Sequence, residues 1–159
     1  MSKDLSLKEL KQKYDELKSK YSLPDFTELN ILFDIEEINT ETNFLLKKIR
    51  IKILEKITDY SRFIEIILNP SNAPFFFFKL LKKLDINDKD YLTKIYDELG
   101  KLEINALSLD FDYSEKNDAE FIKKVFDFFN IQLKKDLLKI IEKFNTENNS
   151  KKINGSYFG

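Results

Sequence analysis

Carboxylates, lysines and tyrosines are the residues of this sequence that could carry chemistry, because its 159 residues include no histidine and no cysteine. Zinc ligation, proton transfer near neutral pH and thiol chemistry therefore lack their usual carriers. With only three glycines, the chain also offers no glycine-rich loop for phosphate. Paired carboxylates could still act as acid and base if burial separated their pKa values, but the sequence marks no such pair. We therefore expect no enzyme, no catalytic residue and no cofactor.

One acidic stretch begins like a calcium loop, with Asp110, Asp112 and Ser114 at alternate positions. A calcium-binding EF-hand loop needs glycine at its sixth position and glutamate at its twelfth, where this sequence has Glu115 and Phe121. A di-iron bundle would need Glu-x-x-His pairs, which a chain without histidine cannot supply. Magnesium bound by carboxylates alone stays open, but the sequence does not place such a site. We expect no metal site.

Apolar residues recur at steps of three and four through most of the chain, and this spacing predicts helices. The expected helices cover residues 5–21, 42–68, 88–107 and 117–144, with shorter helices after Pro24 and Pro74. Residues 107–113 instead alternate strictly between apolar and polar types, which is typical of a strand. Together with residues 31–35, this stretch allows at most a minor two-stranded ribbon; more often such a stretch is an extended connector that lies against a bundle.

The expected fold is all-α, a bundle of five or six helices built on two long antiparallel helices over residues 42–68 and 117–144. Residues 1–144 are expected to form a single helical domain, because a chain of this length can bury a core of its own. The polar residues 145–159 have little to bury and are expected to be disordered. No apolar run has the length of a signal peptide or a membrane span, so we expect a cytoplasmic protein without a membrane partner.

Two apolar features could bind a partner. The four consecutive phenylalanines of residues 75–78 would point about 100° apart on a helix, so they cannot all face one neighbour. The first helix carries a narrow apolar seam with coiled-coil spacing. Alternatively, the rings plug one end of the bundle and the seam packs on its own chain. The expected partner-binding residues are Phe75, Phe76, Phe77, Phe78, Leu7, Leu10, Tyr14 and Leu17.

Basic residues gather on two of the expected helices, although the net charge of the chain is −1. Such faces could meet RNA phosphates, with binding that weakens steeply as salt rises. Only two of the 27 basic residues are arginines, and acidic segments of the same fold could neutralise the lysines instead. The residues of this alternative are Lys47, Lys48, Arg50, Lys52, Lys134, Lys135 and Lys139.

Three short segments resemble a group of small archaeal proteins of unknown function. They are Leu-Pro-Asp-Phe-Thr-Glu-Leu-Asn at residues 23–30, Phe-Asp-Ile at 33–35 and Phe-Leu-Leu-Lys-Lys-Ile-Arg at 44–50. The resemblance lies in apolar spacing; it implies a cytosolic archaeal protein and brings no site residues. We expect a non-enzymatic interaction or scaffolding protein that binds a protein partner or a second copy of itself, as a subunit of a larger assembly. The alternative is an RNA- or ribosome-associated protein.

Overall fold

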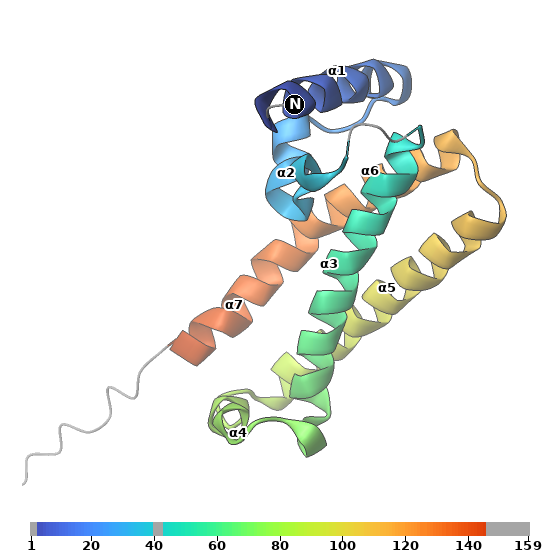
Figure 1. Ribbon diagram of the computed structural model, residues 1–159. Coiled ribbons are helices and arrows are strands. Elements are labelled where there is room, and N and C mark those ends of the chain that lie inside the picture. Colours follow the sequence, from blue (N-terminus) through green and yellow to red (C-terminus); the bar gives the residue numbers. More distant parts are fainter. Residues whose placement is uncertain (1–2, 40–42, 146–159) are drawn as a thin grey trace, which may run out of the picture.

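The computed structural model describes residues 3–39 and 43–145, and in these residues every regular element is a helix (Figure 1). The predicted all-α bundle is confirmed. A π-helical segment, Phe128–Leu133, joins the last two helices without a break. Of the tail expected to be disordered, Asn145 is instead the last residue of the last helix, and residues 146–159 lie outside the described residues. Residue 42, where the first of the two long helices was expected to start, also lies outside them. The α-helices are α1 (Lys3–Tyr21), α2 (Phe26–Phe33), α3 (Leu45–Leu68), α4 (Phe75–Leu81), α5 (Ile86–Phe111), α6 (Glu115–Asp127) and α7 (Lys134–Asn145).

The extended conformation expected at residues 107–113, in a ribbon or in a connector, is wrong over residues 107–111, because α5 continues in helical form to Phe111. Asp112 still donates its backbone N–H to the carbonyl of Ser108, as at a helix end. Leu107 and Phe111 would form the buried side of a strand, but both are exposed. They lie four residues apart on the solvent side of α5, so the apparent alternation reflects exposed apolar residues rather than pleated structure.

Helix α3 is central, and its most extensive contact is with α5. The chain reverses direction through α4, so α5 runs antiparallel to α3 (Figure 1). The run over residues 115–145 does not have the antiparallel direction that we predicted for it relative to α3. Near their beginnings α3 and α6 are joined by Arg50 and Asp118, and further along both, Tyr60 meets Phe129, so the run 115–145 crosses α3 in the same general sense. Helix α5, which follows α3 through the short connection that contains α4, is the antiparallel neighbour of α3 instead.

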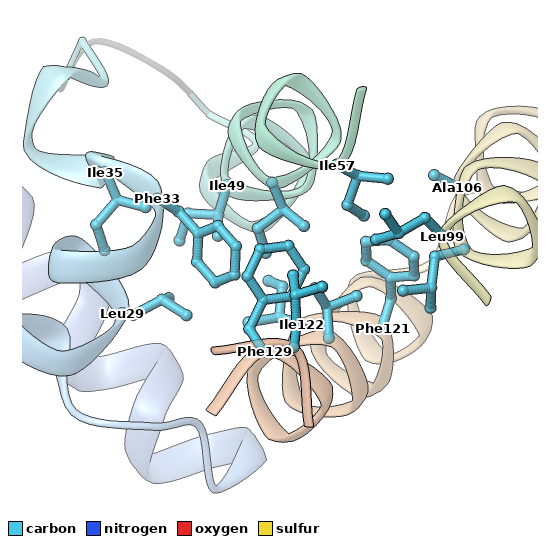
Figure 2. Close-up of a cluster of buried hydrophobic side chains, with 14 of the residues drawn as sticks. Leu29, Phe33, Ile35, Ile49, Ile57, Leu99, Ala106, Phe121, Ile122 and Phe129 are labelled. Carbon is cyan, nitrogen blue, oxygen red and sulfur yellow. The ribbon is translucent and has the colours of Figure 1, made fainter. Parts of the chain in front are cut away.

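The core is continuous from α2 to α5 (Figure 2). At one side, Phe33 of α2 meets Phe129 of the π-helical segment edge to face, with ring centroids 5.0 Å apart. At the other side, Phe121 of α6 points toward Leu99 of α5. Ile49 of α3 lies beside Phe33. The last helical run therefore packs against α2 and α5 as well as α3, and it closes the bundle.

Helix α1 packs on α2 through the seam that the sequence offered to a partner. Leu10 and Tyr14 are buried in the protein's own core, so the structure does not present them to a partner. Leu7 and Leu17 are half-buried against that core. The Tyr14 ring meets Phe26 edge to face, with centroids 5.4 Å apart. The alternative expectation, packing on the same chain, describes this seam.

Tyr14 fastens the α1–α2 connection, because its hydroxyl donates a hydrogen bond of 2.7 Å to the carbonyl of Pro24. Burial, with smaller contributions from Asp25 and Asp15, raises the pKa of this phenol above its ordinary value of 10.0. We expect Tyr14→Phe to lower the free energy of unfolding by about 1 kcal/mol at neutral pH, measured by urea denaturation.

The pH dependence of the free energy of unfolding provides a second test of Tyr14→Phe. Above about pH 10 the unfolded phenol ionises while buried Tyr14 does not, so the wild-type protein loses stability as the pH rises. Tyr14→Phe removes that loss, up to about 1.4 kcal/mol per pH unit, so the gap between the two proteins narrows in alkali. A difference in free energy of unfolding between the two proteins that stays constant above pH 10 would contradict a buried, protonated Tyr14.

Candidate functional site

An apolar groove of about 240 Å³ lies between α2, α3, the π-helical segment and α7. Its floor is made of buried core residues, namely Phe129, Leu133 and Leu137. Its walls are exposed apolar residues, namely Ile31 on α2 and Leu138 and Ile141 on α7. Exposed apolar residues gathered around a concave apolar floor are typical of a surface that binds a partner or an apolar ligand.

The groove arises because the last helical run is apolar over more than the face that the core uses. Leu133, Leu137 and Ile140 are buried, while Ile131, Leu138 and Ile141 lie at the surface. The run passes from α6 to α7 through the π-helical segment, which takes more residues per turn than an α-helix. The wider turn of the π-helical segment therefore changes which side chains of α7 face the core. The apolar spacing of the sequence includes Ile141 as well as Ile140, and periodicity alone does not show which part of this broad stripe a neighbour covers.

One cation lines the groove, Lys134, and a second, Lys135, is next to it in the chain. Both lysines are exposed, and neither forms an ion pair with any residue in the described ranges. Lys139, the third lysine predicted on this helix, lies 3.9 Å from Asp136. The groove therefore has a basic edge that the described part of the fold does not neutralise.

The basic face predicted on α3 is divided by the structure. Arg50 is buried and cannot contact RNA on the folded protein, so its place in the RNA alternative is wrong. Lys47 lies 3.8 Å from Asp110, and Lys52 pairs with Glu37 at 2.8 Å, while Lys48 is exposed. Acidic residues of the same fold thus take up part of this charge.

Arg50 is instead the centre of a buried polar network. Its guanidinium donates three hydrogen bonds of 2.7 Å, to a carboxylate oxygen of Asp118, to the carbonyl of Ala106 and to a carboxylate oxygen of Asp110. Burial raises the pKa of Asp118 even with Arg50 beside it, whereas the Arg50 hydrogen bond lowers the pKa of the more exposed Asp110. The network ties α3 to α5 and α6, and its chemistry is that of a structural ion pair.

The signal for this network was present in the sequence. Arg50 is four residues after Leu46 and three before Ile53, so it lies on the buried stripe of α3 rather than beside Lys48. Charge alone groups Arg50 with the exposed lysines, whereas its helical spacing predicts that it is buried.

The phenylalanines of α4 lie at one end of the molecule (Figure 1). Phe75 is 79% exposed and Phe76 is 63% exposed; Phe78 is also exposed, and Phe77 is half-buried. No side chain of α4 is fully buried, so the rings do not plug the bundle. The predicted surface at residues 75–78 is therefore accessible, unlike the seam of α1.

The described residues, 3–39 and 43–145, contain no cluster of three or more carboxylates placed to hold a metal ion. None of their helices has the length and apolarity that crossing a membrane requires. Comparison of the chain with protein-family models, with curated proteins and with solved structures finds no match.

Proposed function

We propose that this is a non-enzymatic interaction protein that binds an amphipathic helix of a partner protein in the groove between α2 and α7. The observation that supports this function is the groove itself, where Phe129, Leu133 and Leu137 form an apolar floor beneath walls of exposed apolar residues. Exposed walls at Ile31 and Leu138 would be covered by such a partner, and covering apolar surface is the main gain of helix-in-groove binding.

The spacing of the exposed residues favours a helix as the occupant. Along α7 the groove is lined by Lys134, Leu138 and Ile141, at steps of four and three residues. This is the spacing of a coiled-coil seam, into which a neighbouring helix fits side chains at three- and four-residue steps. A helix seated there would also contact Ile31 on the opposite wall, and α2 and α7 would hold it from both sides.

Charge favours a partner with an acidic flank. Lys134 and Lys135 have no ion pair with any residue that the structure describes, so carboxylates on the partner helix would find cations at the groove edge. An RNA partner has less support, because Arg50 is buried and Lys47, Lys52 and Lys139 have acidic neighbours.

A synthetic helical peptide tests the groove directly. The probe carries leucine at the seam positions and glutamate at the flanking positions, with a fluorescent label for anisotropy titration. We expect the wild-type protein to bind this peptide and Leu138→Asp to raise the dissociation constant at least about tenfold, because a buried leucine contributes roughly 1.5–3 kcal/mol. A version with lysine at the flanking positions should bind more weakly, since it would meet Lys134 and Lys135.

Ile104→Asp is the matched control, because Ile104 is an exposed isoleucine on α5, outside the groove. The proposed function fails if the wild-type protein does not bind the peptide, or if Ile104→Asp weakens binding as much as Leu138→Asp. Sedimentation of the wild-type protein alone identifies a second copy as the occupant if it shows a dimer that Leu138→Asp dissociates.

A further inference from the structure

The α4 tip, meaning residues 75–84, is a second unpartnered apolar surface, and its shape differs from that of the groove. It is a convex end of the bundle formed by a seven-residue helix and the turn that follows it (Figure 1). Phe75, Phe76 and Phe78 are exposed there, and Ile86 is exposed at the first position of α5. An exposed aromatic cluster of this kind marks a contact surface.

The charges of the tip have one sign. Residues 75–84 contain three lysines and no acidic residue. Lys79 and Lys82 are exposed and form no ion pair with any residue in the described part of the chain, whereas Lys83 donates to the carbonyl of Phe144 at 3.0 Å. The acidic residues that follow the tip are already engaged, since Asp88 accepts from Lys143 at 2.6 Å and forms a capping box with Asp85.

We propose that the α4 tip inserts its exposed phenylalanine side chains into an anionic lipid surface. Phenylalanine rings bury readily at the boundary between headgroups and acyl chains, and neighbouring lysines extend their ammonium groups to anionic headgroups. The expectation of no membrane partner came from the lack of a spanning segment, and a peripheral contact does not need one.

The arrangement of the rings favours lipid over a protein surface. Phe75 and Phe78 are three residues apart and share one face of the helix, but Phe76 points about 100° away from Phe75, so the exposed rings cover more than one face. A rigid protein groove covers one face of a helix at a time. A fluid lipid surface surrounds a short convex tip and can cover rings on several faces at once.

Vesicle cosedimentation tests the proposal on the full chain. We expect the wild-type protein to bind vesicles that mix phosphatidylcholine with phosphatidylglycerol more strongly than vesicles of phosphatidylcholine alone. The double variant Phe75→Ser/Phe76→Ser should lose at least about tenfold in partitioning to the anionic vesicles. Lys79→Gln/Lys82→Gln should weaken binding to anionic vesicles and flatten its dependence on salt.

Phe111→Ser is the matched control, because Phe111 is a 92% exposed phenylalanine at the far end of α5. The substituted residues of α4 are exposed, and circular dichroism checks that each variant keeps the helical fold. The proposal is overturned if the wild-type protein stays in the supernatant when the anionic vesicles sediment, or if it binds neutral vesicles equally well. It is also overturned if Phe111→Ser loses as much binding as the Phe75→Ser/Phe76→Ser variant. None of these outcomes affects the groove proposal.

Discussion

Replacing Arg50 by methionine is expected to lower the free energy of unfolding by about 3–5 kcal/mol near neutral pH, the usual cost of leaving a buried charge without its partner. Asp118 is fully buried, and one of its carboxylate oxygens has no hydrogen-bond partner in the described chain even with Arg50 in place. Without the guanidinium, the other oxygen and the carbonyl of Ala106 also lose their donor. Urea denaturation followed by circular dichroism measures the loss.

Lowering the pH should shrink this deficit. Burial already raises the pKa of Asp118, and removing Arg50 raises it further, so the folded variant takes up a proton more readily than its unfolded chain. A raised pKa in the folded state means that stability is regained as the pH falls below that pKa. The difference between wild-type and Arg50→Met should therefore be smaller near pH 4 than near neutral pH.

Two variants separate charge from packing at this site. Arg62→Met is the matched control, since Arg62 is an exposed arginine of the same helix, and its effect should stay within about 0.5 kcal/mol. Arg50→Met/Asp118→Leu removes both charges and should recover most of the loss, because an apolar pair of similar volume replaces a buried ion pair at little cost. An Arg50→Met protein as stable as Arg62→Met, or a deficit that ignores pH, would contradict the buried network.

Phe129→Ala should also lower the free energy of unfolding by about 3–5 kcal/mol, measured in the same denaturation experiment. Phe129 is buried where α2, α3 and the π-helical segment meet, with ring centroids 5.0 Å from Phe33 and 5.7 Å from Tyr60. Its removal leaves a cavity beneath the groove that rigid helices cannot close. Phe129→Leu retains most of the volume and should cost less than about 1.5 kcal/mol.

Phe111→Ala provides the comparison for Phe129, because it deletes the same ring from an exposed position. Its effect should stay within about 0.5 kcal/mol. Equal losses for the two alanine variants would mean that the π-helical segment does not anchor the last helical run to α2 and α3.

The helices were predictable because each has a long apolar stripe with helical spacing. The apolar stripe and the prolines at 70 and 74 indicate where α3 ends and where α4 begins. The acidic residues at 85 and 88, which form the capping box, indicate where α5 begins. The end of α5 was not predictable from alternation. Helical structure at Ala106 and Asp110 brings both to Arg50, and this contact joins residues 56 and 60 positions apart. Spacing within one segment does not contain such information.

The candidate site was predictable only in part. Adjacency of the rings at residues 75–78 predicted only that they could not all face one neighbour, since neighbouring helical positions diverge, and it left open how many of them are exposed. The groove was not expected, because Ile141 and Leu138 belong to the same apolar run as buried Leu137. Which of them is covered depends on the position of α2 relative to α7. That position is set by packing between distant segments, through Phe33 and Phe129.

The central claim is that the groove between α2 and α7 binds an amphipathic helix, and a map of backbone amide chemical shifts tests it most directly. The leucine and glutamate peptide is added to isotopically labelled full-length protein, and the shifts are followed residue by residue. We expect the largest changes around Ile31 and from Ile131 to Ile141, with α4 and α5 unchanged. Changes centred on α4 or α5, or none at saturating peptide, would contradict it.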